Sequence, residues 1–333
     1  MTKVAVLDDW QNIARQSADW APLQGRAEVA FFERPFRNSD DTAGALADFE
    51  VLIPMRERTQ FPKAILDRLP KLRMIALTGA RTWTIDVEEC NWRGIVISNT
   101  GHGNSGAATA ELALGLLLAA ARNIPVADAS MRDGRFQNGV KPGITLDGKT
   151  LGIIGLGKIG SKMARYGLAL GMKVLAWSQN LTDEQAAQAG AKRVDKATLL
   201  KESDAVSLHV VLSERSRNLL GAQDLALMKP GAILVNSSRG PLVDEAALLE
   251  RLQTGKLIAA LDVFGQEPLP ADHPLRSLPN TVLTPHLGYG SQEVYRVFYG
   301  ESIENVLAFL DGKPTRVLNS PAPQARNVRG ERA

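Results

Sequence analysis

The sequence has little of three features that would each assign a protein to a particular class. Its one cysteine among 333 residues, Cys90, cannot form an internal disulfide, which fits a reducing cytoplasm. Its 39 basic and 36 acidic residues leave a net charge of +3, which is too balanced to predict a nucleic-acid partner. No apolar run reaches membrane-spanning length without a break, so no membrane association is expected. The opening MTKVAVLDDW is too short and too acidic for a signal peptide and is typical of a first strand.

The remaining composition is that of a folded protein with a sizeable core. Apolar residues make up 44% of the chain, a normal share for a globular protein. A length of 333 residues predicts two domains. Cys90 stands in VEECNWRG, at an expected helix end without a neighbouring histidine, so a packed and inert thiol is predicted there rather than a nucleophile. No metal site is predicted.

The segment 150–180, TLGIIGLGKIGSKMARYGLALGMKVLAWSQN, predicts a strand, a glycine turn, a helix and a second strand. An apolar run opens it, and apolar residues at steps of three and four follow from Lys158 to the helix stop at Gly171. The turn contains three glycines spaced G-x-G-x-x-G, which are Gly155, Gly157 and Gly160. In this context the spacing favours a dinucleotide site, with phosphates held at the helix N-terminus, over a unit whose glycines serve packing alone.

The second strand of this segment ends without the acidic residue that usually binds the ribose of NAD. Ser178, followed by Gln179 and Asn180, stands in that place, so a 2′-phosphate would not be repelled. No arginine or lysine follows closely to bind such a phosphate, since the next basic residue is Lys192. The sequence therefore leaves both NAD and NADP open as the cofactor.

Short strands and helices alternate on both sides of this segment. Before it, strands are expected at 3–7, 26–32, 51–54, 72–77 and 95–98. After it, strands are expected at 204–211, 232–236, 257–263 and 281–284. This alternation predicts an α/β protein of two domains, each with a parallel sheet and flanking helices.

Three further stretches define the organisation of the domains. The polar, glycine-rich 99–106 predicts a domain boundary. Helix 107–122 is apolar on nearly all sides and must be buried in a core or against another subunit. The segment 125–147 contains no clear strand and several breakers, and it is expected to wrap a surface or a partner. A final helix at 291–309 could return to the first domain, which would make that domain discontinuous.

Three ionisable residues follow predicted strands, where open α/β sheets bind their ligands. They are Arg239, Glu267 and His286. His286 suits acid–base catalysis because imidazole titrates near neutral pH, and Glu267 would fix its tautomer. Arg239 would bind a carboxylate through two parallel hydrogen bonds. Each residue alone could be structural, but their convergence on one rim indicates an active site.

Four blocks of sequence resemble the D-isomer-specific 2-hydroxyacid dehydrogenases, and the resemblance covers almost the whole chain. The blocks are LGIIGLGKIG at 151–160, VNSSRGPLVDEAAL at 235–248, ALDVFGQEPLP at 260–270 and TPHLGY at 284–289. The resemblance implies a Rossmann-type cofactor domain, 101–289, inserted into a flavodoxin-like substrate domain, 1–100 plus 290–333. It also implies hydride transfer between NAD or NADP and a small 2-hydroxy or 2-oxo acid of the glyoxylate or hydroxypyruvate type. A homodimer through helix 107–122 is implied as well.

The same resemblance implies roles for residues at matching positions. Arg239 would bind the carboxylate and carbonyl of the substrate, His286 would be acid and base, and Glu267 would orient it. The residues expected at the cofactor are Gly155, Gly157, Lys158, Ile159, Gly160, Ser178, His209, Val210, Ser237, Ser238, Asp262 and Gly288. Asp262 would approach the nicotinamide amide, and Gly79 and Ala80 would offer backbone N–H groups to the substrate carboxylate.

The sequence departs from the family pattern at positions that bear on ligand choice. Besides Ser178, the segment after His209 lacks the usual proline, and the loop TGARTWTID has fewer glycines than in many members. Arg56 and Arg81 could favour a second carboxylate or a phosphate in the substrate, or could be rim charges. A catalytically silent alternative also stays open, because some proteins similar to this family use the fold as an NAD(H)-sensing corepressor.

Overall fold

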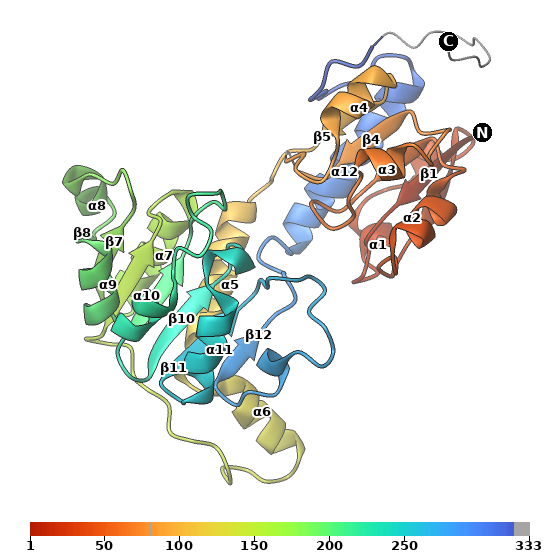
Figure 1. Ribbon diagram of the computed structural model, residues 1–333. Coiled ribbons are helices and arrows are strands. Elements are labelled where there is room, and N and C mark those ends of the chain that lie inside the picture. Colours follow the sequence, from red (N-terminus) through yellow and green to blue (C-terminus); the bar gives the residue numbers. More distant parts are fainter. Residues whose placement is uncertain (80, 323–333) are drawn as a thin grey trace. The chain divides into compact units, whose positions relative to one another are not determined.

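The structure, a computed structural model, describes residues 1–79 and 81–322. It separates into two compact units, here named unit 1 and unit 2 (Figure 1). Unit 1 contains Met1–Asn104 and the chain from Ser291 onward, whereas unit 2 is the continuous stretch Ser105–Gly290. Unit 1 is therefore assembled from segments on both sides of unit 2 in the sequence.

Unit 1 is built on a five-stranded parallel sheet with the order β2-β1-β3-β4-β5. Its strands are β1 (Thr2–Val6), β2 (Ala27–Phe31), β3 (Val51–Ile53), β4 (Met74–Leu77) and β5 (Val96–Asn99). The residues of β3 and β4 are all buried, as the short aliphatic runs predict for strands covered on both faces. Because every pairing is parallel, the loops after the strands meet at one edge of the sheet.

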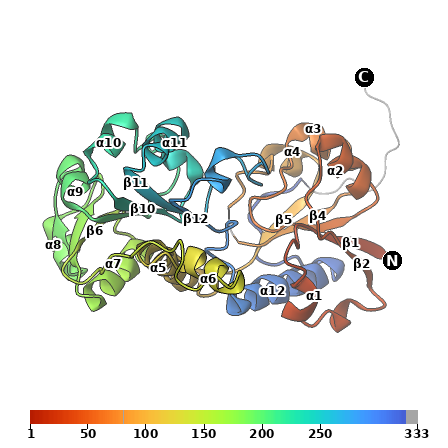
Figure 2. The same ribbon diagram turned by 90° about the horizontal axis from the view of Figure 1, so that it is seen from below.

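Helices cover both faces of this sheet (Figure 2). They are α1 (Ala14–Ser17), α2 (Ser39–Leu46), α3 (Lys63–Leu66), α4 (Val87–Trp92) and α12 (Gln292–Leu310). The face that carries α2, α3 and α4 encloses a core that contains Leu46, Phe61 and Leu66. On the other face, the side-chain amide of Asn305 in α12 donates to the carbonyl of Asn99 at 2.8 Å, which ties the C-terminal helix to β5.

Unit 2 is built on a seven-stranded parallel sheet with the order β12-β11-β10-β9-β6-β7-β8. Its strands are β6 (Thr150–Ile154), β7 (Lys173–Trp177), β8 (Lys192–Arg193), β9 (Ala205–Leu208), β10 (Ala232–Asn236), β11 (Leu257–Leu261) and β12 (Thr281–Leu283). The chain starts in the middle at β6, winds outward to β8, and then returns to β9 on the other side of β6. The strand order therefore reverses between β6 and β9, the place where such sheets bind ligands.

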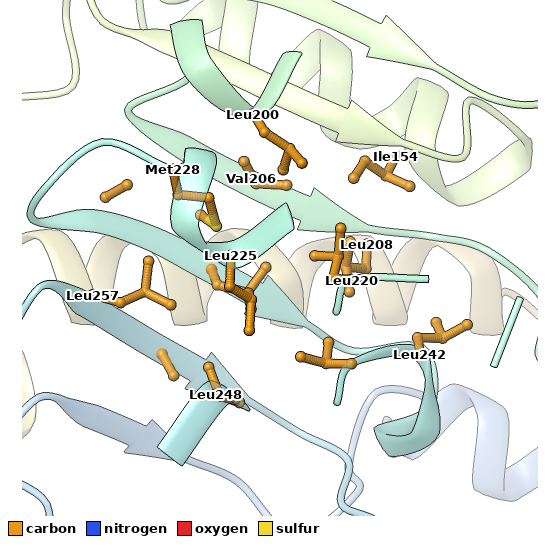
Figure 3. Close-up of a cluster of buried hydrophobic side chains, with 14 of the residues drawn as sticks. Ile154, Leu200, Val206, Leu208, Leu220, Leu225, Met228, Leu242, Leu248 and Leu257 are labelled. Atoms are coloured by element: carbon orange, nitrogen blue, oxygen red, sulfur yellow. The ribbon is translucent and has the colours of Figure 1, made fainter. Parts of the chain in front are cut away.

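The helices of unit 2 form a layer on each face of its sheet (Figure 2). They are α5 (Ser105–Ala121), α6 (Ile124–Arg132), α7 (Lys158–Ala169), α8 (Asp183–Gln188), α9 (Lys196–Glu202), α10 (Ala222–Leu227) and α11 (Glu245–Gln253). Figure 3 shows the core beneath α9, α10 and α11, where Leu200, Leu225 and Leu248 meet Val206 and Leu257 of the sheet. A second core lies on the opposite face, beneath α5 and α7.

The prediction of an α/β fold with two parallel sheets and flanking helices is confirmed. As predicted, no strand forms over 125–147, but helix α6, at Ile124–Arg132, was not predicted. Pro125 stands in the first turn of this helix, where its missing N–H removes no hydrogen bond. The strand predicted at 204–211 is shorter and ends at Leu208, and neither β8 nor α10 was predicted.

Helix α5 is a core helix of unit 2 over much of its surface, with seven residues buried. No single helix among the described residues is long and apolar enough to cross a bilayer. Helices α5 and α6 meet that criterion only as a pair bent by 67°, and length and composition alone make this weak support for a span.

Candidate active site

Three ionisable side chains follow adjacent strands at one edge of the unit 2 sheet. Arg239 lies three residues after β10, Glu267 lies in the loop after β11, and His286 lies three residues after β12. Strands β10, β11 and β12 are neighbours and parallel, so these loops leave the sheet side by side. The structure therefore brings together, within one unit, the three residues predicted to be catalytic.

His286 and Glu267 are in direct contact. Nδ1 of His286 lies 2.5 Å from Oε2 of Glu267, and the other carboxylate oxygen accepts a hydrogen bond from the backbone N–H of Phe264 at 2.9 Å. The side chains are 25% and 32% exposed, so each remains accessible to a ligand. No residue that the structure describes bonds to Nε2 of His286, which is thus the ring nitrogen left for a substrate.

The charge of Glu267 is stabilised by its surroundings. Burial opposes ionisation of this carboxyl, but the hydrogen bond and the charge of His286, the Phe264 N–H and the charge of Arg239 together hold its pKa below the usual value. Glu267 is therefore ionised at neutral pH. A carboxylate in this position fixes the proton of the imidazole on the nitrogen that faces it.

Asp262 fixes the backbone around His286. One of its carboxylate oxygens accepts from the hydroxyl of Thr284 at 2.6 Å and from the N–H of Leu287 at 2.8 Å, and the other accepts from the N–H of Gly288 at 2.8 Å. His286 itself has a φ of 54°, in the left-handed region that side chains rarely adopt. The three bonds to Asp262 on either side of the histidine hold it in this conformation, and burial raises the pKa of Asp262.

Arg239 is held by the end of strand β10. The side chain of Asn236 donates to the carbonyl of Arg239 at 2.9 Å and accepts from the N–H of Ser238 at 3.0 Å. One guanidinium nitrogen of Arg239 donates to the carbonyl of Ser238 at 2.7 Å. The loop is thus folded back on the strand, and the positive charge of Arg239 helps to lower the pKa of Glu267.

The glycine turn between β6 and α7 fits a nucleotide phosphate. Gly155 has a φ of 96°, and a Cβ there would lie 2.5 Å from the carbonyl oxygen of His209. A Cβ on Gly160 would lie 2.1 Å from the carbonyl oxygen of Gly155, so the helix packs directly on the turn. A Cβ on Gly157 would meet no atom within 4 Å, and no side chain caps the N–H groups at the start of α7. Helices α8, α9 and α11 do have such caps, so α7 is the one of these four whose first N–H groups are open to an anion.

A cavity of about 560 Å³ lies beside this turn. Its walls come from the ends of β6, β7 and β9 and the loops that follow them. The lining residues are Gly155, Leu156, Gly157, Trp177, Ser178, Gln179, Asn180, Leu181, Gln185, Val210, Val211, Ser213, Arg215, Ser216 and Leu219. The volume, the mixture of apolar and polar lining and the adjoining helix N-terminus suit the adenosine part of a dinucleotide.

The other residues predicted at the cofactor all lie along the same sheet edge, but not all line the cavity. Gly155, Gly157, Ser178 and Val210 line it, whereas Lys158, Ile159 and Gly160 form the first turn of α7. The hydroxyl of Ser238 donates to the carbonyl of Leu208 at 2.8 Å, so it joins the ends of β9 and β10. Ser237 is buried at the end of β10, and Gly288 is bonded to Asp262.

His209 lies next to the glycine turn, and its ring forms a hydrogen bond within the protein. Its Nε2 lies 2.9 Å from the hydroxyl of Ser207, and its backbone N–H donates to the carbonyl of Ile154 at 2.8 Å. Burial lowers the pKa of His209 to about 4, so the ring is neutral at physiological pH. Its predicted contact with a cofactor stays a prediction.

The predicted substrate residues lie at the corresponding edge of unit 1. Arg56 has a φ of 52°, and one of its guanidinium nitrogens lies 3.4 Å from the position that a Cβ on Gly79 would take. The N–H of Gly79 donates to the hydroxyl of Thr100 at 2.9 Å, so a substrate carboxylate would have to replace that bond. The guanidinium of Arg81 lies over the ring of Trp83, 4.5 Å from its centre. Ala80 lies outside the described residues.

Sequence reasoning missed several residues that build these sites. Asn236 and Thr284 stand inside the family-like blocks, but their roles depend on bonds to backbone groups that spacing does not show. Tyr289 lies with its ring centre 6.0 Å from that of His286. Arg215 lines the cavity beside the glycine turn although it lies 37 positions after Ser178 in the sequence. The prediction for Cys90 is confirmed, because the thiol is buried and its pKa is raised to about 12, chiefly by that burial.

Comparison with known proteins supports one family. Residues 114–288 match the family model described as the NAD binding domain of D-isomer specific 2-hydroxyacid dehydrogenases. The glyoxylate reductase of Thermococcus litoralis is 42% identical over 266 residues, which are 77% of this chain and 80% of that protein. An oxidoreductase structure from Ralstonia solanacearum superposes with a TM-score of 0.91 at 38% identity, over 97% of this chain and 99% of that one.

The chain belongs to the D-isomer specific 2-hydroxyacid dehydrogenase family. Membership in this dehydrogenase family confirms the predicted Rossmann-type nucleotide-binding fold and the nicotinamide cofactor. The D-3-phosphoglycerate dehydrogenase of Methanocaldococcus jannaschii is 40% identical over 276 residues, which are 79% of this chain but only 52% of that protein. The chain thus spans about half the length of such a relative.

Proposed function

We propose that this protein is an NAD(P)-dependent dehydrogenase that interconverts a small D-2-hydroxy acid and the corresponding 2-oxo acid. Unit 2 would be the dinucleotide-binding domain and unit 1 the substrate domain. The observation that carries the proposal is the contact between His286 and Glu267, with Arg239 beside them, on the sheet edge that also bears the glycine turn. An acid–base pair and a guanidinium on a nucleotide-binding sheet are what a hydroxyl–carbonyl interconversion needs from a protein.

A bound nicotinamide supplies the site of hydride gain or loss. The proton of the substrate hydroxyl is handled by His286 through Nε2, because Nδ1 is engaged by Glu267. In the direction of oxidation Nε2 removes the hydroxyl proton, and in the direction of reduction it returns one to the carbonyl oxygen. The carboxylate of Glu267 stabilises the protonated ring and keeps its orientation fixed.

Arg239 has two tasks in this account. Its guanidinium binds the substrate carboxylate, which selects a 2-substituted acid over a simple alcohol. It also lies where it can stabilise the negative charge that develops on the carbonyl oxygen during reduction. The bonds from Asn236 and Ser238 hold the loop ready before substrate arrives, so little reorganisation is required.

The proposed substrate type and oligomeric state follow from the sequence resemblance to the family. We propose a substrate of the glyoxylate or hydroxypyruvate type, with Arg56 and Arg81 as candidates for a second anionic group on it. We also propose a cytoplasmic homodimer whose interface includes helix 107–122. The side chains of Ile124, Val126 and Met131 on the adjacent helix α6 are exposed and apolar, as a second subunit would require.

A substrate panel tests the proposal. The purified protein is given NADH or NADPH together with glyoxylate, hydroxypyruvate, pyruvate or larger 2-oxo acids, and cofactor oxidation is followed by absorbance. Turnover of at least one acid is the expected result, and chiral analysis should give the D-product wherever the product is chiral. Tight nucleotide binding without turnover of any acid in either direction would favour the NAD(H)-sensing corepressor-like alternative instead.

A further inference from the structure

The cavity beside the glycine turn, named here the nucleotide cavity, is lined by one positively charged side chain and by no negatively charged one. Of the 15 residues that line it, Arg215 is basic and none is aspartate or glutamate. At the end of β7, where a carboxylate would bind a ribose 2′-hydroxyl, the lining residues are Ser178, Gln179 and Asn180. Glu214 precedes Arg215 in the chain but does not line the cavity.

The positive charge comes from a residue that follows β9, whereas cofactor choice is usually predicted from the residues that follow β7. The basic residues that follow β7 in the chain are Lys192 and Arg193 on β8, and neither lines the cavity. Arg193 instead forms an ion pair with Asp183 at 3.5 Å. Arg215 belongs to the segment between β9 and α10, which reaches the same cavity because β9 lies next to β6 in the sheet.

The neutral residues at the end of β7 add hydrogen-bonding capacity. The hydroxyl oxygen of Ser178 accepts a bond from the N–H of Leu156 at 3.0 Å, so the residue is anchored to the glycine turn while its own O–H can still donate. Asn180 contributes a side-chain amide with two further N–H donors. A phosphate only accepts hydrogen bonds, so O–H and N–H donors together with one guanidinium suit it well. A ribose 2′-hydroxyl is usually bound by a carboxylate, and no residue that lines this cavity carries one.

We propose that this cavity binds the 2′-phosphate of NADP(H), with Arg215 as the charged contact and Ser178 and Asn180 as neutral donors, so that the protein prefers NADP(H) to NAD(H). The inference rests on the proposed function of unit 2 as the dinucleotide-binding domain. It narrows the choice of cofactor that the sequence left open.

Direct binding measurements test this inference without reference to turnover. The full-length protein is titrated in a calorimeter with NADPH, with NADH, and with the fragments adenosine 2′,5′-bisphosphate and AMP. We expect each 2′-phosphorylated ligand to bind at least about tenfold more tightly than its partner, the range of one charge-assisted contact. The preference should shrink as salt is added, since a charged contact near solvent is screened.

Three variants test which residues cause the preference for NADPH over NADH. Arg215→Ala should weaken NADPH binding by about tenfold to a hundredfold and change NADH binding by less than about threefold. Arg217→Ala is the matched control, because Arg217 is exposed on the same segment but does not line the cavity, and it should change neither. Ser178→Asp keeps an acceptor for the N–H of Leu156 while adding a negative charge, and should reverse the preference in favour of NADH.

Distinct results overturn the inference. Equal or tighter binding of NADH by the unaltered protein contradicts the proposed preference and leaves the dehydrogenase function standing. A loss of both nucleotides in Arg215→Ala, with Arg217→Ala unaffected, would show that Arg215 contacts a part common to both and would overturn its role at the 2′-phosphate. Failure of every nucleotide to bind would overturn the proposed function of unit 2 as well.

Discussion

The two sheets use their carboxyl edges in different ways. In unit 2 the edge brings a histidine, a carboxylate and a guanidinium from three adjacent strands close together, with the first two partly exposed. In unit 1, Asp8 and Arg58 at the edge are instead bonded to groups within the unit. Asp8 is buried and accepts from the hydroxyl of Thr59 at 2.9 Å, while Arg58 donates to the carbonyl of Asp8 at 2.8 Å.

Both edges contain residues in the left-handed region of backbone space. In unit 1 they include Asp8 with a φ of 60° and Arg56 with a φ of 52°, and in unit 2 they include His286 with a φ of 54°. Backbone strain of this kind persists only where surrounding bonds hold it. Similar backbone geometry therefore supports a partly exposed histidine–glutamate pair in unit 2 and an internally bonded loop in unit 1.

The largest expected effect concerns the glycine turn of unit 2. Gly155→Ala should cost about 3–5 kcal/mol of unfolding free energy, because the new Cβ would meet the carbonyl of His209 and the φ is unfavourable. In unit 1, Gly25→Ala has a comparable φ of 74° but open space, and should cost about 1 kcal/mol. Urea denaturation of both variants measures the difference. Equal costs would mean that the glycine turn adjusts readily to a side chain, which would contradict its close packing against His209.

The next effect is an opposite pH response of the two units. Burial lowers the pKa of His209 in the folded protein to about 4, below the ordinary 6.5. The folded state of unit 2 therefore binds fewer protons than the unfolded state, and its stability falls as the pH falls from 6.5 towards 4, by up to about 3 kcal/mol. His209→Gln should remove that part of the acid sensitivity, as thermal unfolding at several pH values would show. An unchanged pH profile would contradict the buried, neutral state of His209.

Asp8 should give the reverse behaviour in unit 1. Its pKa is raised from 3.8 to about 6, mainly by burial, so its contribution to stability is complete below about pH 4 and is lost as the pH rises to 6. Asp8→Asn keeps an acceptor for Thr59 and should be more stable than the unaltered protein at pH 7, by up to about 3 kcal/mol. The advantage should shrink as the pH is lowered to 4. A variant that is less stable at pH 7 would show that the charged form of Asp8 is the stabilising one.

Unit 2 contains two histidine–glutamate contacts, His286 with Glu267 and His273 with Glu245, and only the first should affect kcat. Glu267→Gln preserves an acceptor for the N–H of Phe264 but exchanges a charged hydrogen bond to His286 for a neutral one, and should lower kcat by about tenfold to a hundredfold. Glu245 lies 3.2 Å from Nε2 of His273, outside the predicted site, so Glu245→Gln is a matched control that should leave kcat unchanged. Equal losses in both variants would point to general destabilisation.

Much of the architecture could be predicted because local pattern determines it. The glycine spacing, the aliphatic strands and the residues just after them led to the α/β fold and to the convergence of Arg239, Glu267 and His286. What escaped prediction depends on contacts distant in sequence. Arg215 lines the same cavity as the residues that follow β7 only because β9 returns beside β6, and the N–H of Gly79 is already bonded to a hydroxyl 21 residues further on. Helix α6 was missed because 125–147 contains several breakers, although Pro125 itself occupies the first turn of the helix.

The central claim is that Nε2 of His286 moves the proton of the substrate. The most direct test compares single-turnover rates of His286→Ala and His273→Ala with saturating nucleotide and whichever 2-oxo acid the panel identifies. We expect His286→Ala to slow turnover by about two to four orders of magnitude with nucleotide affinity retained, while His273→Ala should react at the unaltered rate. A His286→Ala protein that binds nucleotide and still turns over at the unaltered rate would contradict the central claim.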